Sequence, residues 1–227
     1  MGVNEKNHIK QNLVLLLLYT FAFFSIWAIY EIFFRSIVHN DNTVLNIIIR
    51  NSIKIMVWTV PVLVILKYYY KVNPISYLKL DSNIKKGVVW GIIVGLLFVM
   101  YGVASNYIFG TGEFNFKFSI YRWLHHVILI GFTEEFVFRG FLFQKIQESA
   151  GFWVANIISA VLFVLIHFPR WYTDGILLGD FIYLLNSIVF AFVFSLLQGY
   201  LLKRTKSLWA CMIVHSLNNM ISIAAVF

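Results

Sequence analysis

The sequence has 227 residues, of which 60% are hydrophobic and 12% are charged, and its formal net charge is +8 at pH 7. The length fits one domain, but the charged share is about half that of a soluble protein. The basic residues stand at the ends of apolar runs and are not interleaved with polar residues, which argues against a nucleic-acid-binding arm and is typical of the loops of a membrane protein.

Seven apolar segments are long enough to be membrane helices. The first, Leu13–Phe34, holds a single charge, Glu31, and at about 1.5 Å per residue it spans roughly 33 Å, enough for a bilayer core of about 30 Å. Lys6 and Lys10 precede it, as in a signal peptide, but the run is too long for one and no small-x-small cleavage site follows. The other six segments are Val44–Leu66, Val88–Phe109, Ile120–Ile146, Phe152–Phe168, Phe181–Leu202 and Leu208–Phe227.

These segments predict an all-α fold, a polytopic membrane bundle of about seven transmembrane helices, or eight if Ile120–Ile146 is broken. We expect one integral membrane domain with two parts, the N-terminal helices of residues 1–119 and a core of residues 120–227. A polar linker, Lys67–Lys86, lies between the second and third segments. The single cysteine, Cys211, stands in an apolar run, so an intramolecular disulfide is excluded.

The basic residues predict the orientation, because cytoplasmic loops carry an excess of lysine and arginine. With the N-terminus in the cytoplasm, eleven basic residues lie inside and six lie outside or at outer helix ends. The eleven are Lys6, Lys10, Lys67, Lys71, Lys79, Lys85, Lys86, Lys145, Lys203, Arg204 and Lys206, and the six are Arg35, Arg50, Lys54, Lys117, Arg122 and Arg170. We therefore expect a cell-membrane protein with a cytoplasmic N-terminus.

The stretch GFTEEFVFRG, from Gly131 to Gly140, places three charges inside an apolar run. A carboxylate at the centre of a bilayer costs about 2.5–3.5 kcal/mol on insertion scales. Two adjacent glutamates are therefore expected there only if they have partners or a function. Glu135 and Arg139 are four residues apart on one helix face and can form an ion pair. Glu134 lies about 100° round the helix from Glu135, which leaves it for another partner.

Two later segments carry polar groups that could meet Glu134. FVLIH ends at His167, and VHSLNN holds His215 and Asn219, which share a helix face. A carboxylate, two imidazoles and an amide on three helices are the groups needed to activate water and stabilise an oxyanion. A buried ion-pair network without chemistry is the alternative explanation of the same residues.

Together the three stretches resemble the CPBP family of membrane proteins, which includes the type II CAAX prenyl endopeptidases and bacterial relatives linked to bacteriocin immunity. EEFVFR (Glu134–Arg139) is similar to the family's EExxxR motif, FVLIH (Phe163–His167) to FxxxH, and HSLNN (His215–Asn219) to HxxxN. The resemblance covers about Ile120–Phe227.

The resemblance implies an intramembrane endopeptidase that cleaves a membrane-associated or lipidated peptide, with membrane lipid as its surroundings and no nucleic-acid partner. It implies that Glu134 and His167 activate the attacking water and that His215 and Asn219 hold the oxyanion. Glu135, Arg139 and the motif residue Phe163 would support the site. Two other functions stay open: a non-catalytic immunity or binding protein of the same fold, and a small transporter or receptor.

A metal is the remaining question about the site. Glu134, His167 and His215 could supply three zinc ligands and leave a fourth position for water. No two of them share a helix, however, and the residue one turn from His215 is Asn219, a poor zinc ligand but a good oxyanion donor. We therefore favour a mechanism without a cofactor, with Glu134 as the base.

Overall fold

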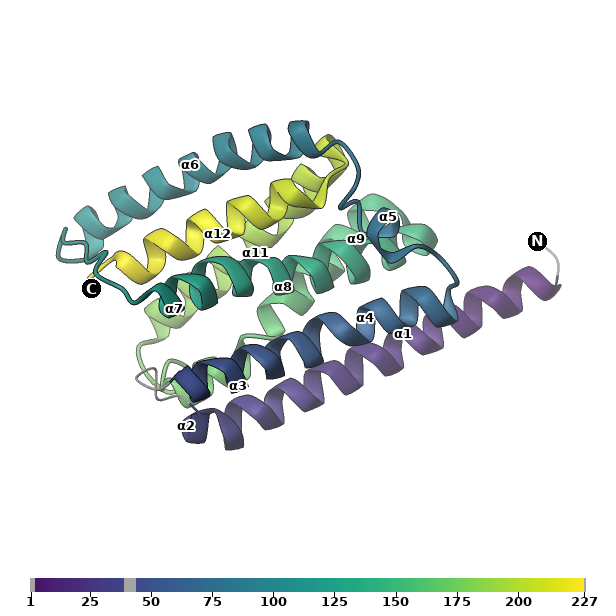
Figure 1. Ribbon diagram of the computed structural model, residues 1–227, viewed down its shortest axis with the longest axis horizontal. Helices are drawn as coiled ribbons and strands as arrows, with labels where there is room; N and C mark the ends of the chain where they lie inside the picture. Colours follow the sequence, from purple (N-terminus) through teal and green to yellow (C-terminus); the bar gives the residue numbers. More distant parts are fainter. Residues whose placement is uncertain (1–2, 39–43, 227) are drawn as a thin grey trace. The chain divides into compact units, whose positions relative to one another are not determined.

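The computed structural model describes residues 3–38 and 44–226, with side chains from residue 11 onward, and most of the described chain is helical (Figure 1). Within these ranges the only extended pairing is one isolated antiparallel bridge between Phe114 and Ala225. The prediction of an all-α fold is confirmed. The side chains of Lys6 and Lys10, and Phe227 at the end of the last predicted segment, lie outside the described residues.

Five helical stretches are long and apolar enough to cross a membrane, as expected of an integral membrane protein. They are Gln11–Val38, Val44–Tyr69, Ile84–Phe109, Ile120–Thr173 and Phe181–Thr205, and Leu208–Ala224 is a shorter apolar helix. The fourth stretch has 54 residues, but Gly151 (φ 78°, ψ 175°) interrupts its helical path. This break falls between the predicted segments Ile120–Ile146 and Phe152–Phe168. The count of seven helices stays a prediction.

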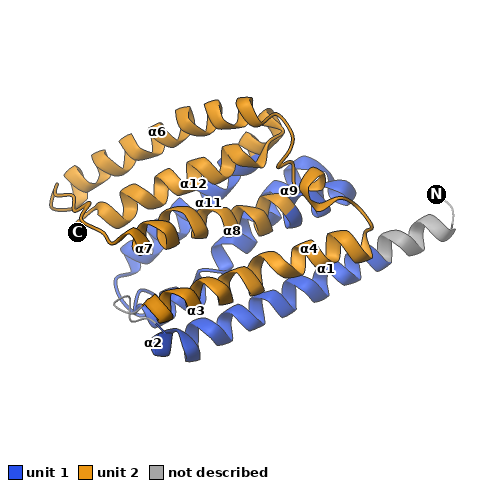
Figure 2. Cartoon of the chain, viewed as in Figure 1, with its two compact units in different colours: residues 1–39, 141–199 blue, residues 40–140, 200–227 orange. Residues whose placement is uncertain are grey.

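The chain forms two compact units, each built from early and late parts of the sequence (Figure 2). Unit 1 comprises Met1–His39 and Phe141–Gly199, and unit 2 comprises Asn40–Gly140 and Tyr200–Phe227. The predicted division at residue 119 is a different grouping and stays a prediction.

Unit 1 contains the first helix and the helices on either side of the loop between Thr173 and Phe181. Its elements are α1 (Val3–Ile29), η1 (Tyr30–Phe34), α2 (Arg35–Val38), α9 (Gln144–Leu165), α10 (Phe168–Thr173) and most of α11 (Phe181–Thr205). The buried Asn156 on α9 donates its side-chain amide to the carbonyl of Leu196 on α11 at 3.1 Å. This contact gives Asn156 a packing role, because it pairs a polar group that lipid cannot satisfy.

Unit 2 contains the second and third predicted segments, the glutamate pair and the last helix. Its elements are α3 (Val44–Lys54), η2 (Ile55–Thr59), α4 (Val60–Val64), η3 (Ile65–Tyr69), α5 (Pro74–Tyr77), α6 (Ile84–Phe109), α7 (Ile120–Arg122), η4 (Trp123–Leu129), α8 (Ile130–Glu135) and α12 (Leu208–Ala224). The π-helical η5 (Phe136–Phe143) begins in unit 2 and ends in unit 1.

Helix α12 is the centre of unit 2, and α6 runs along it (Figure 1). Three glycines at four-residue spacing, Gly87, Gly91 and Gly95, face it. A Cβ atom added at any of them would come within 3.0 Å of a side chain of α12 or of Ser207 just before it. The small-residue row therefore sets a close approach of the two helices, as in many membrane bundles.

A fourth glycine, Gly131, brings α8 close to α12. A Cβ at Gly131 would lie 2.9 Å from Oγ and 3.1 Å from the backbone nitrogen of Ser216. Glu134 and Glu135 follow within the next turn, so this contact fixes the distance from the glutamates to His215, the neighbour of Ser216.

The helix that opens unit 2 changes its winding after Lys54. The wider π-helical turn η2 follows, and Pro61 comes two residues after it. Proline has no N–H to donate and its ring crowds the carbonyl one turn earlier. A wider turn in front of Pro61 relieves this crowding, and π-helical turns are frequent at functional sites.

Candidate active site

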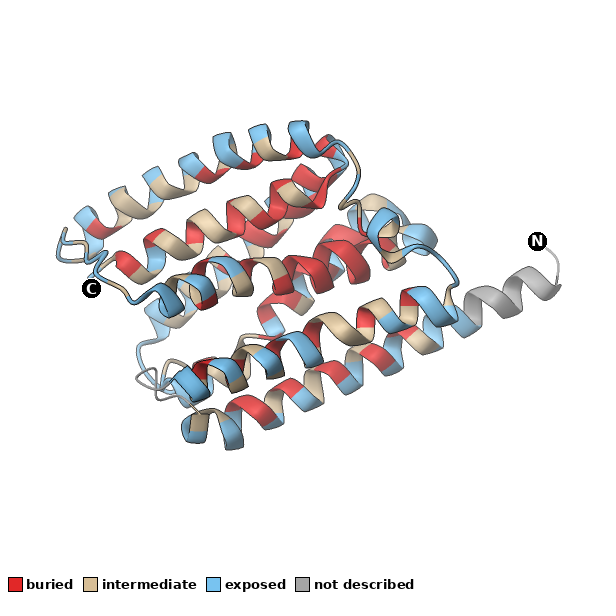
Figure 3. Ribbon diagram, viewed as in Figure 1, coloured by how far each residue is buried: buried red, intermediate tan, exposed pale blue. Residues whose placement is uncertain are grey.

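The glutamate pair lies in the most deeply buried part of the chain. Every residue from Thr133 to Gln144 is buried (Figure 3). Glu134 is 7% exposed and Glu135 is completely buried. Charged side chains in such surroundings need partners, because an isolated carboxylate loses its hydration without compensation.

Glu135 has two partners on the same carboxylate oxygen. Arg139 donates from Nη1 to Oε1 at 3.2 Å, as the four-residue spacing predicts, and His215 donates from Nδ1 to the same oxygen at 2.7 Å. A carboxylate paired with arginine only accepts hydrogen bonds, so Nδ1 of His215 carries the hydrogen. The other ring nitrogen, Nε2, is the one that faces Glu134.

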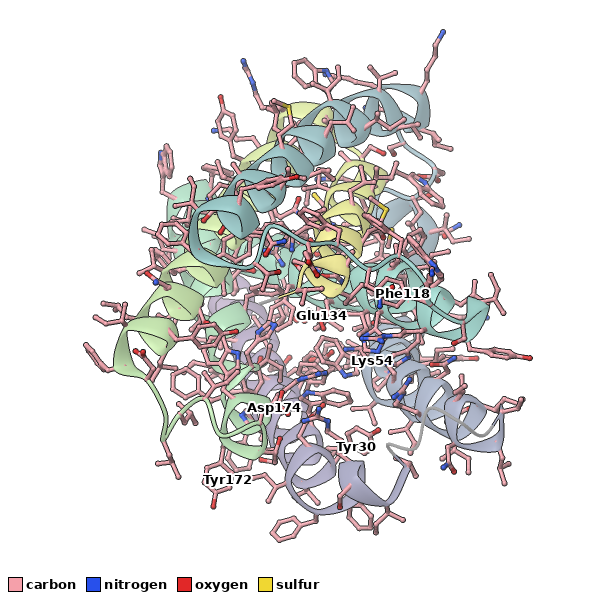
Figure 4. All side chains as sticks on the ribbon, turned by 90° about the vertical axis from the view of Figure 1, so that its left-hand side faces the viewer. Tyr30, Lys54, Phe118, Glu134, Tyr172 and Asp174 are labelled. Carbon is pink, nitrogen blue, oxygen red and sulfur yellow. The ribbon has the colours of Figure 1, made fainter. Side chains whose placement is uncertain are left out.

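Glu134 points to two different elements. Its Oε1 accepts a hydrogen bond from Nζ of Lys54 at 2.9 Å, and its Oε2 lies 3.8 Å from Nε2 of His215. Figure 4 labels Lys54 and Glu134, which lie beside each other. A separation of 3.8 Å is too long for a direct hydrogen bond and suits a bridging water or substrate atom.

Lys54 corrects one prediction from the sequence. We counted Arg50 and Lys54 among the basic residues of the outer side and its helix ends, but Lys54 is 5% exposed and Arg50 is 7% exposed. Both residues stand well inside the stretch Val44–Tyr69, and Lys54 is bound to Glu134. The cation paired with Glu134 is therefore Lys54, while Arg139 is paired with Glu135.

Asn219 lies one turn beyond His215 on α12. Its Nδ2 donates to the backbone carbonyl of His126 on η4 at 3.0 Å. An amide nitrogen carries two hydrogens, so this bond holds the side chain and leaves a second N–H for another acceptor. The neighbouring His125 is also fixed, by a short hydrogen bond between its Nδ1 and Oδ1 of Asn51 on α3.

The FxxxH residues belong to unit 1. His167 follows the end of α9, and its Nδ1 donates to the carbonyl of Phe163 at 2.7 Å. The buried ring of Phe163 meets the imidazole edge to face at 4.9 Å between centroids, and Trp171 contacts it at 5.6 Å. Phe163 thus orients the ring and directs Nε2 away from α9. The predicted distance between His167 and Glu134 stays a prediction.

In unit 2 the charged groups form a row with balanced charge. Two cations, Lys54 and Arg139, and two carboxylates enclose the imidazole of His215. Such an arrangement can hold a water at Nε2 and Oε2, accept its proton on Glu134, and keep the total charge of the row near zero.

A comparison with protein-family models finds a match for the segment that contains Glu134, Glu135, Arg139 and His215. Residues 115–221 match the model described as type II CAAX prenyl endopeptidase Rce1-like. This match supports membership of the chain in that family.

The Rce1-like match contains all three motifs, from Glu134 to Asn219, and confirms the family resemblance of the sequence. The family is a protease family of the membrane, so an endopeptidase acting on peptide substrates is the activity it suggests. No curated protein and no solved structure matches the chain. Lys54 lies before the matched segment and is the site residue that the sequence reasoning missed.

Proposed function

We propose that the protein is an intramembrane endopeptidase that hydrolyses a peptide bond of a membrane-associated or lipidated peptide, with Glu134 as the general base. The observation that carries the proposal is the 3.8 Å separation between Glu134 Oε2 and His215 Nε2, with Glu134 Oε1 held by Lys54. Two buried groups that face each other at this distance favour a water between them.

In this reaction the water gives a proton to Glu134 as its oxygen attacks the scissile carbonyl carbon. The carbonyl becomes an oxyanion, and the groups we assign to hold it are the second N–H of Asn219 and Nε2 of His215, which donates there only when both ring nitrogens carry a hydrogen. The C–N bond then breaks, and Glu134 returns the proton to the leaving nitrogen. His167 is assigned, from the family motif, to assist the attacking water.

We propose that the reaction proceeds without a metal. The donor atoms of the site support this: Lys54 places a positive charge 2.9 Å from Glu134 Oε1, and Nδ1 of His215 is used by Glu135. A dication beside that ammonium would be repelled. Among the described residues, no group of three or more His, Cys, Asp and Glu side chains is arranged to hold a metal ion.

The first experiment finds a substrate and then tests Glu134. Membrane and peptide proteomes of cells with the intact protein and with Glu134→Gln are compared, and a peptide that accumulates uncut is assayed with purified protein. We expect Glu134→Gln to lower turnover per folded molecule by about 10²–10⁴-fold, the usual contribution of a general base. The control is Glu113→Gln, because Glu113 is exposed in the same unit.

Turnover that survives Glu134→Gln would contradict the assignment of Glu134 as the base, whereas finding no peptide that the intact protein cleaves would favour a non-catalytic or transport role. Treatment with a strong chelator tests the metal. We expect unchanged cleavage after exhaustive chelation, and loss of activity that zinc restores, together with stoichiometric zinc by elemental analysis, would instead make Glu134, His167 and His215 ligands.

A further inference from the structure

Lys54 is a buried cation in the middle of a membrane-spanning stretch. It is residue 11 of the 26 in Val44–Tyr69, and it lies where a lysine without a partner is strongly unfavourable. Its ammonium bonds Glu134 at 2.9 Å across 80 positions of sequence. A long-range ion pair at this depth requires a specific approach of α3 to α8.

A tryptophan one turn further on fixes the ammonium from the other side. Nζ of Lys54 lies 3.8 Å from the ring centroid of Trp58, within the range of a cation–π contact. Trp58 is 1% exposed, and its ring packs against Phe138 at 6.0 Å. Lysine is a flexible side chain, so an aromatic wall on one side and a carboxylate on the other restrict it to one position.

The hydrogen bond from Lys54 fixes the orientation of the Glu134 carboxylate. A carboxylate has two oxygens on one plane, so holding Oε1 at Lys54 determines where Oε2 can lie. In the structure Oε2 then faces Nε2 of His215. Glu135, which is itself paired with Arg139, holds the histidine at its other ring nitrogen, Nδ1. Lys54 and Arg139 therefore occupy equivalent positions, one behind each glutamate.

We infer that Lys54 is a positioning residue of the active site, which aims the reactive oxygen of Glu134 at the attacking water. This inference rests on the proposed function of Glu134. Lys54 acts through the carboxylate and does not touch substrate. Because it lies outside residues 115–221, the N-terminal part of the chain contributes to the site as well as to the bundle.

The test compares Lys54→Met, Lys54→Gln and Lys54→Arg with Lys117→Met, a change of an exposed lysine in the same unit. Turnover and KM are measured on the peptide substrate per folded molecule in detergent, with the folded fraction taken from gel filtration. We expect Lys54→Met to lower kcat by about 10²-fold with KM changed less than about twofold, as for a misplaced catalytic group. Lys54→Arg keeps the cation and should recover to within about tenfold of the intact protein.

The variants separate this inference from the proposed function. A purely structural lysine would lower the folded fraction and leave kcat per folded molecule unchanged, which would overturn the inference while Glu134→Gln remains inactive. If Lys54→Met does not fold, Lys54→Gln and Lys54→Arg decide, and an arginine variant no more active than the glutamine variant contradicts the inference. Full activity of Glu134→Gln would instead remove the proposed function itself.

Discussion

Two clusters of charged side chains use the same residue types in different surroundings. In unit 2, the row of Lys54, Glu134, His215, Glu135 and Arg139 is almost completely closed to water. In unit 1, Arg35 bonds Asp174 at 2.6 Å and approaches Glu31 at 3.6 Å, while Arg170 bonds Asp174 at 3.1 Å. Asp174 and Arg170 keep 31% and 40% of their side chains exposed.

The comparison shows that burial, and not the number of ion pairs, determines what a charge cluster can do. Exposed pairs contribute about 0–1 kcal/mol, because water stabilises the separated ions nearly as well. Removing one partner of a buried pair costs about 3–5 kcal/mol, because the other charge stays behind without hydration. The unit 1 cluster joins η1 and α2 to the end of α10, whereas the unit 2 row holds two carboxylates in place around His215.

The strongest way to break the buried row is Glu135→Gln. This change leaves Arg139 without its carboxylate and His215 without a charged acceptor at Nδ1. We expect a loss of about 3–5 kcal/mol in the free energy of unfolding, measured by thermal and denaturant unfolding in detergent. Glu135→Gln combined with Arg139→Met should be more stable than Glu135→Gln alone, and equal stability of the two would contradict the buried pair.

Asn219, one turn beyond His215 on α12, allows turnover to be tested separately from stability. Asn219→Ala removes an amide that holds the carbonyl of His126 and that we assign to the oxyanion. We expect turnover to fall by about 10²–10³-fold, the usual loss for one oxyanion donor, with little change in KM. A hundredfold weaker substrate binding at unchanged turnover would place Asn219 in substrate recognition instead.

A smaller effect is expected where the row is aligned by packing alone. Gly131→Ala puts a methyl group 2.9 Å from Oγ of Ser216 and pushes α8 from α12. Overpacking of this kind costs typically about 1–3 kcal/mol. We expect both lower stability and lower kcat, because the distance from Glu134 to His215 changes. Combining Gly131→Ala with Ser216→Ala removes the crowded hydroxyl and should restore part of the lost stability.

Gly151→Ala cannot serve as a matched control for this substitution, because Gly151 has a positive φ that strains alanine as well.

The smallest effect should come from Asp174, the partly exposed carboxylate of the unit 1 cluster. Asp174→Asn is expected to cost about 0.2–1 kcal/mol, as for other surface pairs. Partial burial raises the pKa of the Asp174 carboxyl, but the hydrogen bond and charge of Arg35 and the charge of Arg170 outweigh it, and the pKa ends below its ordinary value of 3.8. A lowered folded-state pKa stabilises the fold above the unfolded-state value, and this contribution is lost as the pH falls through the folded-state value.

The melting temperatures of the intact protein and Asp174→Asn should therefore differ most at neutral pH and converge below about pH 4. A loss comparable with that of Glu135→Gln would show that the distinction between the two clusters is wrong.

Local patterns in the sequence predicted the parts of the site that lie within one helix. Glu135 and Arg139 were predicted to pair from their spacing, and they do. His215 was expected near Glu134, and it lies there, although Glu135 makes the shorter contact. Lys54 was missed because its partner is 80 residues away, and no periodicity within a helix reveals such a contact. Its place in the middle of an apolar run was the available signal, since a charge there needs a partner.

The number of membrane helices was less predictable for a different reason. Hydrophobic runs locate helices, but the helix continues through the polar residues Gln147, Glu148 and Ser149 and its path is interrupted only at Gly151. The assignment of FxxxH to the site likewise rests on the family and not on a contact in the sequence, because Phe163 and His167 determine only their own orientation.

The glycine row of α6 predicts how this helix would respond to random substitution. Gly87, Gly91 and Gly95 face α12, while Ile92, Leu96 and Met100 are exposed on the helix surface. A saturation-mutagenesis profile along α6 should therefore oscillate with a repeat of about four residues. At the glycines even alanine would lower the yield of folded protein, whereas apolar exchanges at the lipid-facing positions would leave it unchanged. The sensitivity would spread through α12 to His215, so a helix without any polar site residue would nevertheless restrict which variants remain active.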